Sequence, residues 1–325
     1  MTNRINVLYT CDNAYLPLTS ISMASVISNN PDNDICFYIA TENKDNKDFD
    51  KLVSYYSNNK HITIKHLDCT KYDSLLESKN LDKWGSKSFY VYWKLFAYDK
   101  LDVDYIWYLD SDELCLSKIE NPDLLDKAIG GTLDSAHASF NKVAHINENY
   151  YFFNTGALFI NVNNWKKNNC TEKIVNYIKE MKYKPLMCDQ DIFAIALQDD
   201  FKVLDPKYNF LAGYDYYGVH NSFKMYSLDS KPFYKEEEIE EAKDKVIFYH
   251  YLGGVFGRPW QKGNYCPRSE YFIEARKNSC WPEFETEFNQ STLFKVQKVL
   301  EILPKGLYNK IHNLAQRLHV KSMAK

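Results

Sequence analysis

Two carboxylates at the end of a short apolar segment constrain this chain more than any other feature. Residues 105–109 read Tyr-Ile-Trp-Tyr-Leu and are followed directly by Asp110, Ser111 and Asp112. These β-prone residues predict a buried strand that delivers charge to the edge of a sheet. Because alternate side chains of an extended backbone share a face, we expect Asp110 and Asp112 to project together and Ser111 to project away. A divalent cation between the two carboxylates would remove their repulsion.

The same tripeptide has a simpler interpretation. Asp-Ser-Asp after a strand is also typical of a solvated turn whose side-chain oxygens cap the next helix. Other motifs in the sequence are needed to distinguish a turn from a cation site.

Composition places the chain among globular proteins and argues against one class of partner. The 325 residues are 45% hydrophobic and 16% aromatic, which is ample for a large core. A net charge of −3 gives no electrostatic support for a general nucleic-acid-binding role. The charge is uneven, because seven Lys or Arg and one acid from Lys295 onward give +6, and 33 basic and 42 acidic residues before it give −9.

The sequence also predicts a cellular compartment. The eight cysteines form no C-x-x-C pair, so we expect reduced, mostly structural thiols. The polar N-terminus shows neither a signal peptide nor a transit peptide, and no apolar stretch approaches the ~20 residues of a membrane span. We therefore expect a cytoplasmic protein, either soluble or peripheral on the inner face of the membrane.

Strands and helices alternate along the first half of the chain. We expect strands at residues 5–10, 35–39 and 62–67, and helices at 17–29, 47–57 and 88–98. This order predicts an α/β fold, a Rossmann-like and mostly parallel sheet flanked by helices. Ligands of such sheets bind beyond the carboxyl ends of the strands, where Asp12 and Asp110 fall.

The second half is less regular. Residues 151–162 resemble two short strands hinged at Asn154-Thr155-Gly156, and 171–182 predict an amphipathic helix. Residues 188–191 are expected to cap a helix over 192–197. A further strand over 246–249 ends at His250 and precedes a loop that contains Gly253, Gly254 and Arg258.

These motifs, taken in order, resemble glycosyltransferase family 8. The resemblance rests on Asp-Ser-Asp, Asn-Thr-Gly, Asp189-Gln190-Asp191 and the segment from His250 to Trp260, and it covers roughly residues 5–262. The family contains retaining enzymes such as bacterial lipopolysaccharide glucosyl- and galactosyltransferases and glycogenin. The resemblance implies a GT-A fold and a UDP-sugar donor, UDP-glucose or UDP-galactose.

The resemblance also implies a metal centre made of Asp110, Asp112 and His250. A metal there would stabilise the charge that develops on the departing diphosphate. Mixed carboxylate and imidazole ligation suits Mn²⁺, and Mg²⁺ less well because it prefers oxygen ligands. A hydrogen-bonded core histidine remains the alternative for His250.

The other site residues follow from the same resemblance. Thr10, Asp12 and Tyr15 resemble the uridine pocket, although Asp12 could simply cap a turn, and Ala14 stands where many members have Asn. Lys94 lies where the family often has an Arg that reaches the donor, and an exposed helix lysine is the alternative. The remaining expected donor contacts are Ser111, Asn154, Thr155, Gly253 and Arg258.

Two features of the reaction stay open in the sequence. Asp189 and Gln190 resemble the pair at the reacting face of the sugar, and we favour same-face substitution over a double displacement with Asp189 as nucleophile. The loop from His250 departs from the family pattern His-x-x-Gly-x-x-Lys-Pro-Trp, because Arg258 replaces the Lys and about two residues are inserted.

A basic extension follows the catalytic part. We expect a catalytic domain over residues 1–265, with a nucleotide-sugar half at about 1–115 and an acceptor half at about 116–265, and a small helical extension over 266–325. Two short helices broken at Pro304 are predicted, the last with an apolar stripe of Leu307, Ile311, Leu314 and Leu318. Lys310, Arg317 and Lys321 lie off the stripe, which favours docking on anionic lipid. Packing on the catalytic domain or on a dimer partner is the alternative.

The sequence therefore predicts a metal-dependent, retaining glycosyltransferase. It would transfer glucose or galactose from a UDP-sugar to a glycan or glycolipid acceptor, such as lipopolysaccharide or another surface polysaccharide. Two alternatives share the Asp-x-Asp motif: a nucleotide-sugar hydrolase or nucleotidyltransferase, and a protein that binds sugar nucleotides without catalysis.

Overall fold

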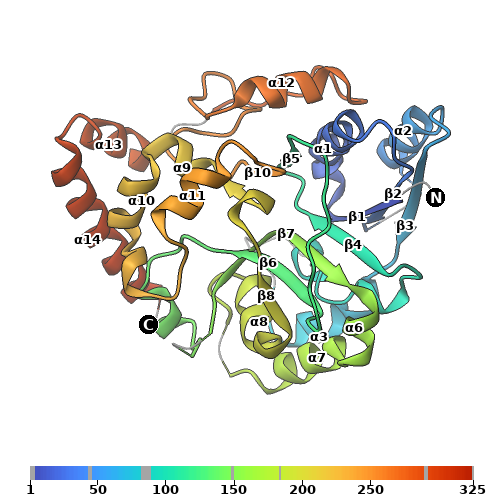
Figure 1. Ribbon diagram of the computed structural model, residues 1–325, viewed down its shortest axis with the longest axis horizontal. Helices are drawn as coiled ribbons and strands as arrows, with labels where there is room; N and C mark the ends of the chain where they lie inside the picture. Colours follow the sequence, from blue (N-terminus) through green and yellow to red (C-terminus); the bar gives the residue numbers. More distant parts are fainter. Residues whose placement is uncertain are drawn as a thin grey trace.

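Two β-sheets of unequal size form the centre of the molecule. The computed structural model describes residues 4–42, 46–81, 89–147, 150–182, 184–288 and 292–323. The large sheet has seven strands in the order β3-β2-β1-β4-β7-β6-β8, and the small sheet has three in the order β5-β10-β9 (Figure 1). The strands are β1 (Ile5–Thr10), β2 (Ile35–Ala40), β3 (Ile62–Leu67), β4 (Tyr105–Leu109), β5 (Glu113–Cys115), β6 (Ile129–Leu133), β7 (Phe153–Asn161), β8 (Phe201–Val203), β9 (Phe210–Leu211) and β10 (Phe248–His250).

The large sheet is mostly parallel, as predicted. Strands β1, β2, β3 and β4 pair in parallel, and so do β6 and β8. Only β7 runs antiparallel to both of its neighbours, β4 and β6. The carboxyl ends of β1, β4 and β6 therefore share one edge, and the reversed β7 begins at that edge with Asn154, Thr155 and Gly156.

The two-strand interpretation of residues 151–162 is wrong. Strand β7 is continuous through Asn154-Thr155-Gly156, and all nine of its residues are buried. Phe153 pairs with Leu133 of β6, and Ala157 pairs with Leu109 of β4. The register between β6 and β7 shifts over this stretch, so the strand carries an irregularity where a hinge was expected. The side chain of Asn154 accepts a hydrogen bond from the backbone of Gly156 at 2.9 Å instead of turning the chain.

The helices begin and end near most of the predicted boundaries. They are α1 (Leu16–Asn29), α2 (Lys47–Tyr56), α3 (Asp73–Ser78), α4 (Tyr90–Trp93), α5 (Phe140–Val143), α6 (Val162–Lys167), α7 (Cys170–Glu180), α8 (Asp189–Ala196), α9 (Ala212–Tyr217), α10 (Val219–Tyr226), α11 (Glu236–Ala242), α12 (Ser269–Lys277), α13 (Thr292–Leu300) and α14 (Lys305–Met323). Asp189, Gln190 and Asp191 form the first turn of α8, where the sequence predicted a cap before residue 192.

The helix predicted over residues 88–98 is much shorter. Ser88 lies outside the described residues, and α4 covers Tyr90–Trp93 alone. The chain then continues in tight turns, in which Leu95 donates to Tyr92 and Phe96 donates to Trp93, both at 3.0 Å. All side chains from Tyr92 to Tyr98 are buried, so this segment packs in the core on every side and has no exposed face of the kind that an amphipathic helix needs.

Both faces of the large sheet are covered. Ile106 and Tyr108 of β4 belong to one apolar cluster, which includes residues of α6, α7 and α8. Trp107 and Leu109 belong to the other, which includes residues of α1 and α2. Coverage of both faces is typical of sheets whose strands are nearly continuous apolar runs.

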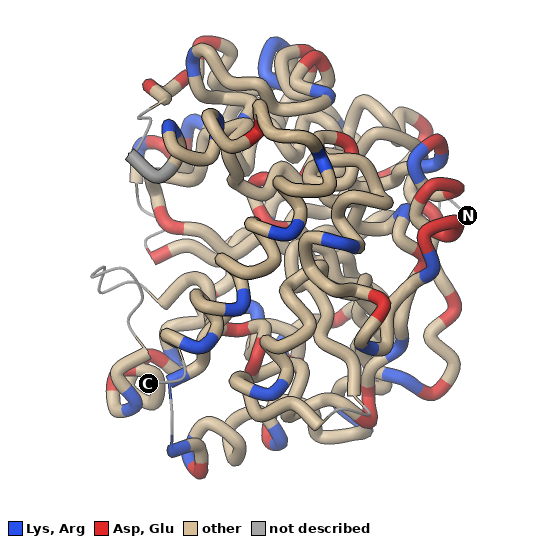
Figure 2. Tube along the Cα trace, turned by 90° about the vertical axis from the view of Figure 1, so that its left-hand side faces the viewer, with Lys and Arg blue, Asp and Glu red and all other residues tan. Residues whose placement is uncertain are grey.

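The C-terminal helices pack on the preceding part of the chain, with α14 against α10 (Figure 1). Figure 2 shows basic and acidic residues spread along the whole trace. Asn309 donates to the side chain of Asn221 at 2.8 Å, and Asn313 donates to the backbone of Lys224 at 3.1 Å. Helix α14 is 19 residues long, not short as predicted, and it begins at Lys305, directly after Pro304. No helix among the described residues is long and apolar enough to span a membrane.

The two sheets lie in close contact at Gly156, and a substitution there tests this packing. A methyl group on Gly156 of β7 would lie 2.3 Å from His250 Cε1 and 2.5 Å from Glu113 Oε1 of the small sheet. His250 and Glu113 are 3% and 0% exposed, so neither can move aside. We expect Gly156→Ala to lower the free energy of unfolding by about 1–3 kcal/mol in urea denaturation.

Gly213→Ala is the matched control for this substitution. A methyl group on Gly213, in α9, would meet nothing within 4 Å. This change should stabilise the protein slightly, by about 0.4–1 kcal/mol, through the unfolded state. A Gly156→Ala protein as stable as Gly213→Ala would contradict the close contact between the sheets.

Candidate active site

A cleft of about 220 Å³ lies at the edge where β1 and β4 end and β7 begins. Residues far apart in the sequence line it, and most are polar or charged. They include Thr10, Tyr15, Tyr90, Lys94, Tyr108, Asp110, Ser111, Asp112, Asn154, Thr155, Gly156, Asp189, Gln190, His250 and Arg258. Of the predicted site residues, only Asp12 and Gly253 are not in this lining, and each contacts a residue that is.

The acidic pair sits in a turn and not in an extended strand. Strand β4 ends at Leu109, and the backbone of Glu113 donates to the carbonyl of Asp110 at 3.1 Å, which closes a β-turn. Asp110 itself donates to the carbonyl of Gly156 at 2.7 Å. The two carboxylates converge, as predicted, but a turn brings them together and strand alternation does not. Ser111 faces α1, where its hydroxyl lies 2.8 Å from that of Thr19.

Asp110, Asp112 and His250 form a cluster that could hold a metal ion. Each offers one ligand atom, and these atoms all lie within 4.8 Å of one another. His250 reaches the cluster because β10 pairs antiparallel with β5, the strand that directly follows Asp112. Its Nε2 lies 3.4 Å from Asp112 Oδ1. Two carboxylates and one imidazole fit a transition metal such as Mn²⁺.

Nearby cations and burial set the protonation of the acidic pair. Burial raises the pKa of Asp110, and Lys94 only partly offsets this effect. Burial also acts on Asp112, but His250 and Arg258 outweigh it and hold the pKa of Asp112 below its usual range. Arg258 donates from Nη1 to Asp112 Oδ2 and to the carbonyl of Tyr251, the latter at 2.8 Å. Its two cationic neighbours therefore favour the anionic form of Asp112.

Lys94 joins the acidic pair to helix α8. Its side chain is 3% exposed, which excludes the alternative of an exposed helix lysine. Its Nζ lies 3.0 Å from Asp110 Oδ1 and 3.2 Å from Asp189 Oδ2. Burial lowers the pKa of Lys94, but the two carboxylates outweigh burial and leave it above its ordinary value. Lys94 thus carries a permanent charge between two carboxylates.

Of the three residues predicted to bind the nucleotide, Thr10 and Tyr15 line the cleft and Asp12 does not. Asp12 caps a short turn by accepting a hydrogen bond from the backbone of Tyr15 at 3.0 Å, as its simpler interpretation proposed. The Tyr15 ring is 41% exposed and lies 6.2 Å from that of Tyr90. Thr10 contacts the hydroxyl of Tyr108 at 3.2 Å. An aromatic surface open to a ligand is present, and a base-binding role for Asp12 stays a prediction.

The glycines after His250 leave space for other side chains of the same loop. A Cβ on Gly253 would lie 2.9 Å from Arg258 Nε, and one on Gly254 would lie 2.9 Å from the ring of Phe256. Gly253 therefore makes room for the guanidinium that binds Asp112. A direct contact of Gly253 with phosphate stays a prediction.

Sequence reasoning missed several polar residues of the site. Asn154 donates to Asp134 at 2.8 Å, Tyr108 donates to Asp110 Oδ1, and Glu113 Oε1 lies 3.0 Å from His250 Nδ1. Tyr108 could have been found, because it precedes Asp110 by two residues. Asp134 and Glu113 could not, because their partners come from strands whose pairing the sequence does not reveal.

The pKa values of Glu113 and His250 are both raised, the first by burial and the second by neighbouring carboxylates. Burial raises the pKa of Glu113 to about 8, although His250 opposes this rise. Burial lowers the pKa of His250, but Glu113 and Asp112 outweigh it and bring the value to about 9. His250 and Asp112 thus stabilise each other's charges inside the cleft, whereas burial favours the protonated form of Glu113.

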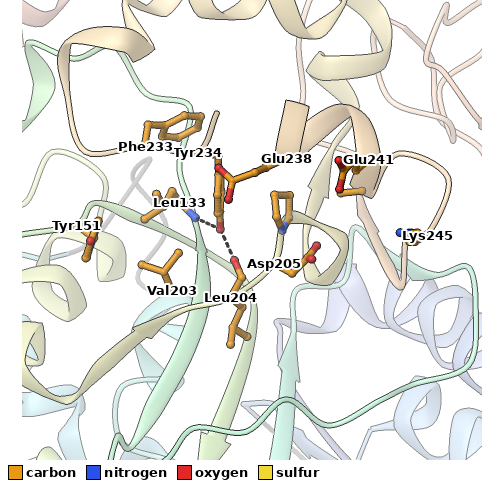
Figure 3. A pocket seen from close by; sticks show the side chains of 12 residues that line it. Leu133, Tyr151, Val203, Leu204, Asp205, Phe233, Tyr234, Glu238, Glu241 and Lys245 are labelled. Carbon is orange, nitrogen blue, oxygen red and sulfur yellow. Dashed lines mark hydrogen bonds between the residues drawn. The ribbon is translucent and has the colours of Figure 1, made fainter. Parts of the chain in front are cut away.

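A larger hollow of about 510 Å³ lies beside β6, β8 and α11 (Figure 3). Figure 3 shows the Tyr234 hydroxyl at its centre, bonded to Leu204 and Leu133. Its central polar group is therefore already satisfied. The smaller cleft, where charged side chains converge, is the better candidate for an active site.

Comparison with known sequences identifies the family of the chain. Residues 6–263 match the model of the family described as Glycosyl transferase family 8. A lipopolysaccharide 1,3-galactosyltransferase of Salmonella typhimurium is 25% identical over 296 residues, which cover 86% of this chain and 80% of the relative. A lipopolysaccharide 1,2-glucosyltransferase of Escherichia coli is 26% identical over 293 residues, which cover 85% and 79%.

Solved structures share the fold. A galactosyltransferase, LgtC, in complex with donor and acceptor sugar analogs superposes with a TM-score of 0.64 at 18% identity, over 83% of this chain and 95% of that one. The apo form of mouse xyloside xylosyltransferase 1 superposes with a TM-score of 0.52 at 14% identity, over 76% and 97%. This likeness shows the predicted GT-A fold. Because the family model also spans most of the sequence, the chain belongs to glycosyl transferase family 8 and is a glycosyltransferase.

Proposed function

We propose that this glycosyltransferase transfers glucose or galactose from a UDP-sugar to a hydroxyl of a surface glycan, with Mn²⁺ at Asp110, Asp112 and His250. The convergence of these three side chains carries the proposal, because their ligand atoms lie within 4.8 Å of one another. Mg²⁺ is less suited to a site with an imidazole ligand. The two relatives named above are lipopolysaccharide galactosyl- and glucosyltransferases, which favours lipopolysaccharide or a similar glycolipid as the acceptor.

The charges of the cleft suit a diphosphate leaving group. A divalent cation would stabilise the negative charge that develops as the diphosphate departs. Arg258 uses Nη1 for Asp112 and for the carbonyl of Tyr251, and its fork carries further N–H donors that could bind phosphate oxygens. Ser111 and Gly253 would border the diphosphate, while Thr10, Asp12 and Tyr15 would contact the uridine.

The polar residues of β7 and α8 are placed to bind the sugar. Asn154 and Thr155 line the cleft at the start of β7. Gln190 also lines it, and its amide Nε2 is buried with no hydrogen-bond partner among the residues that the structure describes. A buried donor without a partner is costly, and a sugar hydroxyl would satisfy it.

Asp189 is better placed to orient than to attack. Its Oδ2 accepts a hydrogen bond from Thr155 at 2.7 Å and lies 3.2 Å from Lys94 Nζ. An oxygen held by two donors is a weak nucleophile. This geometry favours retention by same-face substitution, in which the departing phosphate takes the proton of the acceptor hydroxyl, with Asp189 positioning the reactants.

We also propose that helix α14 attaches the enzyme to an anionic membrane surface on the cytoplasmic side. Leu307, Leu314 and Leu318 are 48%, 58% and 59% exposed, because α14 packs on α10 through its other face. Beside them lies a groove of about 580 Å³, lined by the basic side chains of Lys224, Lys310 and Arg317 among others. Exposed leucines next to cations match a surface of anionic headgroups above acyl chains.

The first test is donor turnover. We expect UDP release from UDP-glucose or UDP-galactose that requires Mn²⁺, stops with EDTA and increases when a lipopolysaccharide-core acceptor is added. Asp112→Asn should lower kcat by about 10²–10³-fold, because the site loses a ligand charge. Asp199→Asn, which changes an exposed carboxylate, is the control. Release that ignores the acceptor would favour a hydrolase, and no release with any donor would favour binding alone.

The second test concerns Lys94. Lys94→Met leaves Asp110 and Asp189 uncompensated, and we expect the free energy of unfolding at pH 8 without metal to fall by about 3 kcal/mol. The loss should shrink at pH 5. Without Lys94 the pKa of Asp110 rises further above its unfolded value, and such a group stabilises the fold only while it is protonated.

Denaturant unfolding at the two pH values measures this effect. Lys277→Met is the control, because Lys277 forms an exposed ion pair with Glu274 at 3.2 Å. Its removal should cost less than about 1 kcal/mol at either pH. An equal loss at pH 5 and pH 8 for Lys94→Met would contradict the charge argument.

The third test is membrane binding. We expect the protein to co-sediment with phosphatidylglycerol vesicles, more weakly with phosphatidylcholine vesicles and more weakly at high salt. Leu314→Ser combined with Leu318→Ser should reduce binding at least about tenfold, because two apolar side chains no longer enter the lipid. Leu125→Ser, at a loop leucine that is 68% exposed, should bind normally. Unchanged binding by the double variant would remove this role of α14.

A further inference from the structure

Glu113 is a buried carboxylate that the proposed chemistry does not use. It is 0% exposed and follows Asp112 directly, at the start of β5. In the antiparallel pair of β5 and β10 it lies opposite His250. Opposite residues of such a pair face the same side of the sheet, so the two side chains meet.

Glu113 and Asp112 each face a different nitrogen of the His250 ring. Glu113 Oε1 lies 3.0 Å from Nδ1, and Asp112 Oδ1 lies 3.4 Å from Nε2. Asp112 belongs to the candidate metal cluster, so Nε2, which faces this carboxylate, lies on the side of the cluster. The nitrogen that faces Glu113 points away from it and needs a hydrogen-bond acceptor if it carries the proton.

The surroundings hold the ring in this orientation. The backbone of Gly156 closes over the pair, because a Cβ there would lie 2.5 Å from both Glu113 Oε1 and His250 Nδ1. The side chain of Asn209, 2% exposed, lies 3.3 Å from the same Nδ1, and with its amide turned round its nitrogen also donates to Glu113 Oε1 at 3.2 Å. The imidazole is 3% exposed, so solvent does not compete for it.

Stability alone does not account for a carboxylate at this position. The second oxygen of Glu113, Oε2, is buried and has no hydrogen-bond partner within the described part of the chain. A buried carboxyl group whose hydrogen bonds are only half satisfied usually costs more than an apolar side chain of the same size. Among the residues that the structure describes, the one ion pair of this carboxylate is the contact with His250.

We propose that Glu113 is a positioning residue that accepts the Nδ1–H hydrogen bond of His250 and so presents Nε2 as a lone pair to the metal. Metal-bound histidines commonly donate their other ring nitrogen to such a carboxylate, which fixes the tautomer and the orientation of the ring. The inference rests on the proposed metal site and adds a residue behind it.

Two substitutions separate positioning from a structural role. Glu113→Gln keeps an oxygen acceptor for Nδ1–H, whereas Glu113→Met keeps the volume and removes the acceptor. The dissociation constant for Mn²⁺ alone can be measured from the electron paramagnetic resonance signal of the free ion. We expect Glu113→Met to weaken Mn²⁺ binding by about 10–100-fold and Glu113→Gln to stay within a few-fold of the unaltered protein.

Thermal melting without metal supplies the second readout. A positioning residue predicts that Glu113→Met melts at or above the temperature of the unaltered protein while it binds Mn²⁺ poorly. Cys115→Ala, at a buried position two residues along β5, should leave the affinity for Mn²⁺ unchanged. Equal Mn²⁺ affinity in Glu113→Met and the unaltered protein would overturn the inference, as would equal losses in the Met and Gln variants.

A measurement on the unaltered protein covers the case in which Glu113→Met fails to fold. Nitrogen-15 NMR of the histidine rings, with diamagnetic Zn²⁺ added, reports which nitrogen of His250 carries the proton. A proton on Nδ1 with Zn²⁺ on Nε2 supports the proposal, and the reverse tautomer overturns it. If the unaltered protein binds neither Mn²⁺ nor Zn²⁺, the proposed metal site fails, and this inference fails with it.

Discussion

Mutual compensation of buried charges is the constraint on which the structure of the cleft depends. Asp112, Glu113 and Asp189 are at most 15% exposed at the side chain, and Asp110 is 31% exposed. Such a set would repel itself strongly without cations. Lys94, His250 and Arg258 supply them, each from a different part of the chain. The fold therefore has to bring these segments together before the acidic side chains can be buried beside one another.

The topology of the two sheets provides that arrangement. The parallel strands β1 and β4 deliver Thr10 and the acidic turn to one edge, and the reversed β7 returns to the same edge with Asn154 and Thr155. The small sheet then pairs Glu113 with His250 across two short strands. Gly156 lies where the sheets meet, because a side chain there would displace the imidazole from the cluster. The same strands that bury the charges thus fix their relative positions.

Local patterns in the sequence predicted much of this and failed where long-range pairing decides. Strand β1 and helix α1 follow from apolar runs bounded by turn residues, and the Asp-Ser-Asp motif identified the right edge of the sheet. The strand β7 was divided in two because Asn-Thr-Gly is typical of a turn, and only its pairing with β4 and β6 keeps it extended. The site residues that were missed, Glu113 and Asp134, interact with His250 and Asn154 across strands, which no spacing in the sequence reports. The domain boundary at residue 265 stays a prediction.

The central claim is that Asp110, Asp112 and His250 bind one cation that also contacts the diphosphate of the donor. Crystals of the protein grown with Mn²⁺ and UDP, with anomalous scattering data collected at the manganese edge, test it most directly. The account predicts one manganese peak in coordination contact with both carboxylates, with His250 Nε2 and with phosphate oxygens of UDP. A peak elsewhere, or a manganese ion from which His250 points away, would contradict it.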